Sequence, residues 1–339
     1  MQDRKIRIHD VAALAGVSVG SVSRVLNRAA NVSAEVREQV ERAVAALRYQ
    51  PSHAARALRS RSSRTIGCLF SDVTNPLYAR AFRALEESFR ADGYMLLLAN
   101  GLNDLERERE SLRTFALRGM DGVVCAPGNE RDPELIGLID AMSMPVVLYD
   151  REMPTARTDA VLFDHVSGVR SACTQLFALG HRRIALALWD ADSRPVRRRT
   201  EGYRAAYRAA GMEPPALILR QPTATSSVFD DLLRLLNAPD PPSALIAQGT
   251  HTLVSALRAL AHAGLRVPQD FSVISIGDSD FAQTHVPAIS VLRTNAGHVA
   301  AQVRCMLLER LNGARAAPPR KVLMPYELEM RASCGPPAR

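Results

Sequence analysis

Residues 8–27 read "IHDVAALAGVSVGSVSRVLN", and this stretch decides the fold of the N-terminal region. Apolar side chains recur at the spacing of one helical face: Ile8, Val11, Ala12 and Ala15. Gly16 then offers a left-handed stop, and Ser18 is a good N-cap for a second helix. The pattern predicts two short helices joined by a tight turn, which is the helix-turn-helix arrangement.

The expected second helix has two unlike faces. Its apolar face consists of Val22, Val25 and Leu26, and the other face consists of Ser18, Gly20, Ser21, Ser23, Arg24 and Asn27. Serine hydroxyls can bond phosphates or base edges, Gly20 permits close approach, and Arg24 can form paired bonds to guanine or a phosphate. Because the second helix of this motif lies in the DNA major groove, the polar face is predicted to contact DNA.

A third helix follows, with Ser33 as its cap and Glu35 in its first turn. Its apolar stripe is Val36, Val40, Ala43, Val44 and Leu47. The net charge of +8 is concentrated in this region: residues 1–64 hold 12 Lys and Arg against 5 Asp and Glu, and the rest of the chain holds 31 against 30. A basic region with apolar periodicity indicates a separate domain that binds a polyanion, rather than a solvated tail.

Residues 51–64, "PSHAARALRSRSSR", are expected to form a linker. Pro51 ends the third helix, and Ser52 can cap a short helix that runs through Leu58. Leu58 is a large apolar side chain in an otherwise small and basic segment. It either packs on a neighbouring domain or inserts as a wedge into a minor groove.

From Thr65 onward, apolar runs alternate with amphipathic segments. Ten runs are expected to be strands: "TIGCLF", "YMLLLA", "GVVCA", "PVVLYD", "AVLF", "RIALALW", "ALILR", "SALIAQ", "FSVISI" and "ISVLR". Nearly continuous apolar strands separated by helices predict parallel sheets covered on both faces, here divided between two lobes. Ligands of such folds bind at the carboxyl ends of the strands. Those ends are rich in polar residues at 71–76, 150–151, 164–165, 189–192, 249–251 and 277–280.

Several classes of protein are disfavoured by what the sequence lacks. It has no P-loop, GxSxG, HExxH or GxGxxG motif, and its five cysteines show no metal-ligand spacing, so we expect no metal site and no cofactor. No run approaches 18 apolar residues, and the first ten residues do not resemble a secretory signal. We therefore expect a cytoplasmic protein with reduced thiols.

The chain resembles transcription regulators of the lactose-repressor/galactose-repressor (LacI/GalR) family. The N-terminal pattern spans "IHDVAALAGVSVGSVSRVLNRAANVSAEVREQVERAVAALRYQPSHAARAL". Further matches are "NPLYA" at 75–79, "GYMLLLAN" at 93–100, "DGVV" at 121–124, "PVVLYDR" at 145–151, "LGHRRIAL" at 179–186, "RTEGYRAAYRAAG" at 199–211, "GLRVPQDFSVIS" at 264–275 and "PYELEMRASC" at 325–334. The resemblance covers essentially the whole chain.

The resemblance implies an all-α helix-turn-helix head followed by an α/β body of two lobes, similar to a periplasmic binding protein. It places the head at 1–50, the hinge helix and linker at 51–64, and the effector-binding and dimerisation domain at 65–339. Three crossovers are expected near 162–164, 290–293 and 322–325. They divide the body into an N-lobe (about 65–162 and 292–323) and a C-lobe (about 163–291 and 324–339). The family's proteins dimerise and bind an inverted-repeat operator.

DNA contacts carry over from the family to Ser18, Val19, Gly20, Ser21, Ser23, Arg24, Asn27, Asn31 and Leu58. Val19 and Gly20 match the variable pair that sets operator choice, so neither hydrogen-bonds a base through its side chain here. Leu58 matches the leucine that opens the central minor-groove step. Ser52 departs from the usual Asn but remains a helix cap.

Effector contacts carry over to Asn75, Leu77, Tyr78, Asp150, Asp164 and Arg199. Arg199 suits sugar hydroxyls or a carboxylate, although it also belongs to a run of arginines that could be a solvated surface. The family's Asn-Asp and Gly-Phe-Asp-Asp motifs are replaced by Gly249-Thr250 and by residues 275–278, so Asp278, Asp280 and Thr250 are expected to compensate, and the family's standard hexose contacts are not assumed. Trp189, the sole tryptophan, either stacks on a sugar face or fills the core.

Two other functions compete with that of a regulator. An enzyme with a DNA-binding appendage has only His165, His251 and His285 near strand ends in its favour, and a periplasmic receptor requires a signal peptide and no basic head. The favoured prediction is a cytoplasmic, homodimeric regulator and not an enzyme. It would bind double-stranded operator DNA, by family default as a repressor, under the control of a small polar effector, a sugar or a sugar acid.

Overall fold

The computed structural model describes residues 6–26, 29, 31–49, 62–221, 227–313 and 317–338. The chain divides into two compact units, Met1–Ser63 and Arg64–Arg339, which we call the head and the body. Each unit has hydrophobic core clusters of its own.

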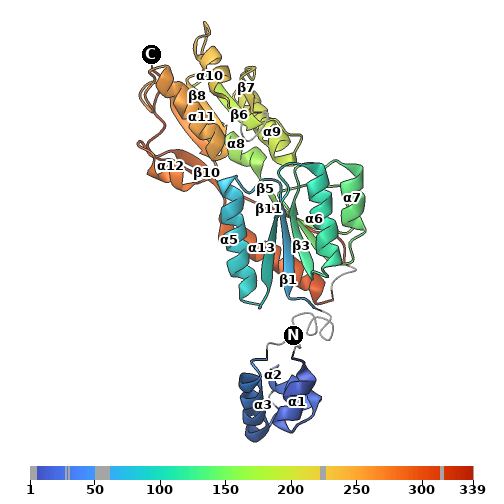
Figure 1. Ribbon diagram of the computed structural model, residues 1–339. Coiled ribbons are helices and arrows are strands. Elements are labelled where there is room, and N and C mark those ends of the chain that lie inside the picture. The colour runs from blue at the N-terminus through green and yellow to red at the C-terminus, as the bar shows by residue number, and fades with distance from the viewer. Residues whose placement is uncertain are drawn as a thin grey trace. The chain divides into compact units, whose positions relative to one another are not determined.

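The head contains the three predicted helices, α1 (Ile8–Ala15), α2 (Val19–Leu26) and α3 (Ala34–Ala46) (Figure 1). Gly16 ends α1 with φ 66°, the left-handed conformation predicted for it. The Oγ atom of Ser18 accepts a hydrogen bond from the backbone N–H of Ser21 at 3.1 Å, and Ser33 does the same for Val36 at 3.4 Å. Both predicted N-caps are confirmed.

One apolar cluster holds the three helices together. Its buried members are Val11, Ala12, Ala15, Val22, Val25, Val40 and Ala43. Because the apolar face of α2 is used in this core, its serine-rich face is left outward.

The body is built on two six-stranded sheets. In spatial order, the first contains β11 (Lys321–Met324), β5 (Asp159–Phe163), β4 (Val146–Tyr149), β3 (Gly122–Ala126), β1 (Thr65–Phe70) and β2 (Met95–Asn100). The second contains β12 (Glu327–Glu329), β10 (Ser290–Arg293), β9 (Ser272–Ile276), β8 (Ala244–Gln248), β6 (Ile184–Trp189) and β7 (Ile218–Gln221). All neighbouring strands are parallel except β10 and β12. Each of the ten predicted runs contains a strand, and β11 and β12 are additional.

Helices cover both faces of each sheet (Figure 1). On the first sheet, α5 (Pro76–Arg90) and α13 (Ala296–Leu311) pack on one face, and α6 (Leu105–Leu117) and α7 (Pro133–Asp140) pack on the other. On the second sheet, α8 (His165–Ala178) and α9 (Arg194–Ala209) lie opposite α10 (Phe229–Leu236) and α11 (Gly249–His262), and the short α12 (Asp280–Thr284) precedes β10. This is the two-lobed α/β architecture predicted from the apolar runs.

The chain passes between the two sheets three times. It crosses after Phe163, between Arg293 and Ala296, and between Met324 and Glu327. The second crossing therefore comes a few residues later than predicted, because Ser290, Val291 and Leu292 still pair with β9 of the second sheet. We call residues 64–163 with 296–324 the first lobe, and residues 164–293 with 325–338 the second lobe.

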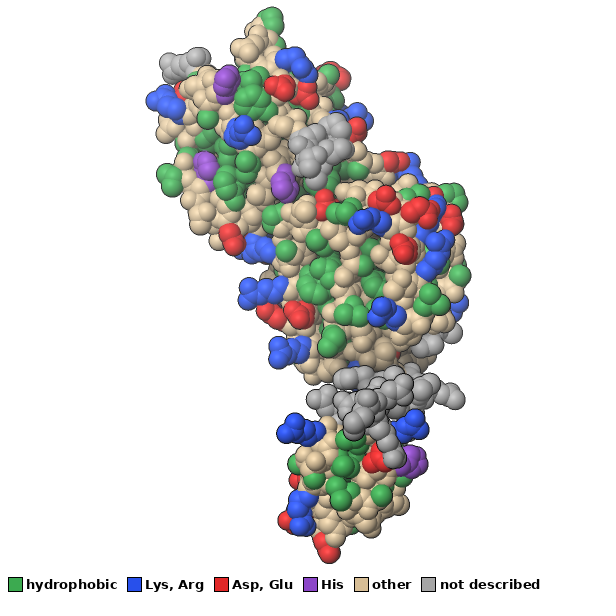
Figure 2. Space-filling view, viewed as in Figure 1, with side chains coloured by type: hydrophobic (Ala, Val, Ile, Leu, Met, Phe, Trp, Pro, Cys, Tyr) green, Lys and Arg blue, Asp and Glu red, His purple; other side chains and the backbone are tan. Residues whose placement is uncertain are grey.

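No helix in the described part of the chain is long and apolar enough to cross a membrane. On the face of the body seen in Figure 2, basic and acidic side chains are intermingled. This mixture agrees with the nearly balanced charge of the sequence after residue 64.

Candidate functional site

The outward face of α2 carries most of the predicted DNA-contacting residues. Ser18, Gly20, Arg24 and Asn31 are exposed, and Val19, Ser21 and Ser23 are partly exposed. The Oγ atoms of Ser18 and Ser21 lie 3.0 Å apart, and Arg24 Nε donates to the Gly20 carbonyl at 3.4 Å. The face is thus small, polar and basic, as contact with a phosphate backbone requires. Asn27 and Leu58 lie outside the described residues.

A cavity of about 370 Å³ lies between the two lobes of the body. Seven of the nine predicted effector-binding residues line it: Asn75, Leu77, Tyr78, Asp150, Trp189, Arg199 and Asp278. Four of them lie at or just after strand ends, and the other three, Leu77, Tyr78 and Arg199, lie on the helices that follow. The volume suits a ligand of about the size of a sugar.

Two of the predicted residues do not line this cavity. Asp164 caps α8, where its carboxylate accepts the Ser167 N–H at 3.0 Å, so its side chain is used within the helix. Thr250 lines a smaller adjoining pocket together with Trp189 and Arg199. Its Oγ1 atom is buried without a hydrogen-bond partner in the described structure.

Sequence reasoning missed several lining residues. Arg80, Gln248, Asn295 and Tyr326 line the cavity although none was selected, and so does Arg151. Arg151 directly follows Asp150 at a strand end and was detectable from that position. Arg80 and Tyr326 gave no such signal, because one lies in the second turn of α5 and the other lies on a crossover.

A buried chain of polar contacts forms the floor of the cavity. His165 Nε2 lies 2.9 Å from Asp150 Oδ2, and Arg199 Nε donates to His165 Nδ1 at 3.2 Å. Burial lowers the pKa of His165 to about 4, even though Asp150 opposes this shift. The imidazole is therefore neutral near pH 7, carries its proton on Nε2, and holds Arg199 in a fixed orientation.

Asp150 is the centre of this arrangement. Its backbone has φ 51°, and its carboxylate accepts the Phe163 N–H at 3.1 Å and Arg194 Nη1 at 3.0 Å. Burial by itself would raise the pKa of Asp150, but His165, Arg194 and Arg151 together hold it below its ordinary value. The carboxylate is ionised, and both of its oxygens form hydrogen bonds within the protein.

Arg151 is 5% exposed and is held by neighbours of the first lobe. It donates through Nη2 to Tyr78 Oη at 2.9 Å and through Nη1 to the Asp150 carbonyl at 3.0 Å. Tyr78 is itself stacked on Phe70, with ring centroids 4.8 Å apart. The guanidinium thus has a rigid setting at the cavity wall.

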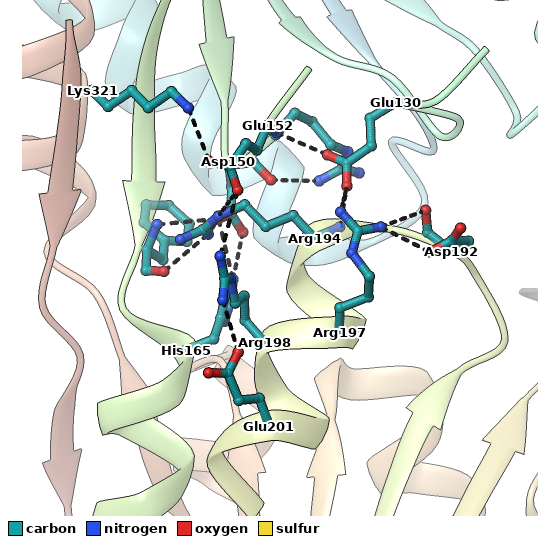
Figure 3. A network of polar contacts seen from close by, with 12 residues as sticks. Glu130, Asp150, Glu152, His165, Asp192, Arg194, Arg197, Arg198, Glu201 and Lys321 are labelled. Carbon is teal, nitrogen blue, oxygen red and sulfur yellow. Dashed lines mark hydrogen bonds and ion pairs between the residues drawn. The ribbon is translucent and has the colours of Figure 1, made fainter. Parts of the chain in front are cut away.

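An ion-pair network joins the lobes along one edge of the cavity (Figure 3). Glu130 of the first lobe is completely buried and accepts Arg197 Nη2 of the second lobe at 2.6 Å. It also accepts the backbone N–H groups of Arg194 and Glu152. Asp192 pairs with Arg197 at 2.8 Å and with Arg131 of the first lobe at 2.8 Å. We call these groups the interlobe latch.

The three histidines considered for catalysis have other contacts. His165 belongs to the chain with Asp150 and Arg199, His251 Nε2 lies 3.2 Å from the Thr74 carbonyl oxygen, and His285 Nδ1 lies 2.8 Å from that of Pro287. A search of the described residues found no group of three or more His, Cys, Asp and Glu side chains suited to a metal ion.

Comparison with known proteins gives matches to both units. Residues 7–52 match the family described as "Bacterial regulatory proteins, lacI family", and residues 173–334 match the "Periplasmic binding protein-like domain". The ribose operon repressor of Escherichia coli (strain K12) is 31% identical over 321 residues, covering 94% of this chain and 97% of the repressor. The regulator CelR of Thermobifida fusca is 32% identical over 328 residues, covering 94% of this chain and 96% of CelR.

A solved structure extends the similarity to three dimensions. The lac repressor dimer bound to operator and the anti-inducer ONPF superposes with a TM-score of 0.85 at 25% identity, covering 97% of this chain and 99% of that one. Together, the helix-turn-helix head, the two-lobed body and relatives above 30% identity over nearly the full length show that the chain belongs to the lacI family of bacterial regulatory proteins.

Proposed function

We propose that the chain is a sequence-specific transcriptional regulator, a repressor, that binds an inverted-repeat operator as a homodimer in the cytoplasm. Its operator binding is controlled by a small polar effector, a sugar or a sugar acid, in the interlobe cavity. The observation that carries the proposal is the full-length relationship to a ribose operon repressor, combined with an outward polar face on α2.

The head contacts DNA through α2 and the segments around it. The proposed contacts are Ser18, Val19, Gly20, Ser21, Ser23, Arg24, Asn27, Asn31 and, in the linker at 51–64, Leu58. The structural relative was solved as a dimer on its operator, which supports this arrangement.

The body contacts the effector through the seven predicted residues that line the cavity, and Arg199 is the principal donor. One relative is named for ribose, and a structural relative was solved with cellobiose. Both ligands are polar sugars, which supports a polar effector for this chain. Closure of the lobes on the effector would change the spacing of the two linkers in the dimer. That spacing decides whether the linker helices pair and insert Leu58.

The test begins with the DNA. We expect the purified chain to enrich an inverted repeat from a random duplex library. Arg24→Ala should then reduce discrimination between this repeat and a mismatched duplex by about 1–3 kcal/mol, because a guanidinium bonded to guanine is lost.

Arg42→Ala is the matched control, since Arg42 lies on α3 with its side chain 70% exposed and 3.8 Å from Glu38. It should leave discrimination unchanged. Failure to enrich any repeat would refute the proposal. If both variants lose discrimination equally, Arg24 does not read the sequence.

A further inference from the structure

We infer that the effector is an anion, and that the cavity selects a carboxylate or phosphoryl group over a neutral sugar. This inference rests on the proposed function and narrows it to one class of ligand. It follows from the balance of hydrogen-bond donors and acceptors in the cavity wall.

The wall contains three arginines without an ion-pair partner in the described structure, although the charge of Arg151 also acts on Asp150 and Glu108. Arg80, Arg151 and Arg199 all line the cavity, and Arg151 and Arg199 are only 5% and 6% exposed. They donate hydrogen bonds to neutral groups: backbone carbonyls for Arg80 and Arg151, the Tyr78 hydroxyl for Arg151, and neutral His165 for Arg199. Among the described residues, none of the three forms an ion pair with a carboxylate.

The carboxylates of the wall are already neutralised by other arginines. Asp150 accepts Arg194 Nη1 at 3.0 Å, and Asp278 accepts Arg331 Nη1 at 2.9 Å. Glu327 lies 3.2 Å from Arg293. Neutral sugars present many hydroxyl donors, which require free acceptors in the protein. In this wall the three carboxylates are each paired with an arginine.

The amide side chains of the wall also present more donors than acceptors to the cavity. The Oδ1 atoms of Asn75 and Asn295 accept backbone N–H groups at the starts of α5 and α13, at 3.1 and 3.0 Å. The Oε1 atom of Gln248 accepts the Trp189 N–H at 3.4 Å. In each case the oxygen already accepts one hydrogen bond, and no contact within the described structure uses the NH₂ group.

The N-termini of two helices add partial positive charge to that of the arginines. Helices α5 and α13, of 15 and 16 residues, have N-cap residues that line the cavity: Asn75 and Asn295. A helix start carries partial positive charge and favours an anion. Buried guanidinium groups, amide donors and two helix starts therefore line one small space, which suits an acceptor-rich anion.

The experiment compares each sugar with its own acid. Glucose is paired with glucuronate and gluconate, ribose with ribonate, and ribose 5-phosphate supplies the phosphoryl group. Binding to the full chain without DNA is followed by thermal unfolding and by the fluorescence of Trp189, the sole tryptophan, which lines the cavity. We expect at least one anion to bind saturably and its neutral partner to bind about tenfold more weakly or not at all.

Two pairs of variants locate the binding. Arg199→Gln should weaken anion binding about tenfold or more, whereas Arg204→Gln, an exposed position on the same helix, should not. Arg80→Gln and the exposed Arg83→Gln form a second pair on α5, in case Arg199→Gln does not fold.

Three results would overturn the inference. They are neutral sugars that bind as tightly as their acids, no binding by any anion of the panel up to about 10 mM, and equal anion affinity in the parent and in both cavity variants. None of these results depends on operator binding, so they are distinct from a failure of the proposed function.

Discussion

Glu108 is a buried carboxyl group whose two oxygens have unlike surroundings. Oε1 accepts the Gly128 N–H at 2.6 Å, and Oε2 has no hydrogen-bond partner in the described structure. Burial raises the pKa of Glu108, and the contact with Gly128 and the charge of Arg151 offset only part of this rise. Folding therefore favours protonation of Glu108 relative to the unfolded chain.

The sign of the pH effect follows from this raised pKa. A carboxyl group with a higher pKa in the folded state stabilises the fold below its unfolded pKa, and this contribution is lost as the pH rises through the folded pKa. Glu108→Gln keeps an oxygen for Gly128 and cannot ionise. We expect the melting temperature of the variant, minus that of the parent, to increase as the pH rises from about 4.5 toward 7.

Melting temperatures at several pH values test this prediction, with Glu110→Gln on the exposed side of α6 as the control. The control should follow the parent. If Glu108→Gln melts lower than the parent by the same amount at every pH, the carboxylate is required in its charged form and the prediction is wrong.

At the scale of elements, α8 and α9 pack closest at Gly202. A Cβ atom there would lie 2.5 Å from the Val166 carbonyl oxygen, a backbone atom that cannot move aside alone. We expect Gly202→Ala to lower the free energy of unfolding by about 1–3 kcal/mol, because the two helices must separate.

Gly137→Ala is the opposite case. Gly137 lies in α7, is exposed, and would have no atom within 4 Å of an added Cβ. Alanine should raise the free energy of unfolding by about 0.4–1 kcal/mol, since it restricts the unfolded chain. Urea denaturation of both variants tests the pair, and equal effects in the same direction would contradict this packing account.

The interlobe latch leads to a prediction about lobe closure. Glu130→Gln removes the charge that faces Arg197 across the lobes, although a similar shape remains. We expect the ligand-free body to open, seen as a larger radius of gyration in small-angle X-ray scattering. Glu134→Gln is the control, because Glu134 pairs with Arg113 at 2.9 Å within the first lobe. An unchanged radius for Glu130→Gln would show that the latch does not hold the lobes together.

The elements could be predicted where one physical signal dominated. Eight of the ten apolar runs became central strands that are buried on both faces, and the other two became the partly exposed edge strands β2 and β7. Strands β11 and β12 gave no such signal. Alternate residues of β11 are exposed at the sheet edge, and β12 has only three residues.

The site was predicted in part for a similar reason. Strand ends located Asn75, Asp150, Trp189 and Asp278 at the cavity, because parallel strands bring their carboxyl ends together. The rule failed for Asp164, whose carboxylate caps its own helix. It could not reveal that Asp150 and Asp278 are neutralised by Arg194 and Arg331, since these pairs join distant parts of the chain.

At the scale of the whole molecule, the account couples two sites on separate units. A ligand changes operator affinity only if it binds one arrangement of the lobes better than another, and the change in affinity measures that difference. In the proposed function, the head supplies affinity and sequence discrimination, and the cavity supplies control. Arg199 belongs to the cavity alone, so its substitution should remove control without changing ligand-free operator affinity.

The most direct test is the operator dissociation constant measured with and without a saturating acid from the ligand panel, by fluorescence anisotropy on the enriched inverted repeat. For the parent chain, the account predicts a change of about tenfold or more, equivalent to about 1.4 kcal/mol of coupling. For Arg199→Gln at the same ligand concentration, it predicts an unchanged constant close to the ligand-free value of the parent. Equal constants with and without saturating ligand in the parent chain would contradict it.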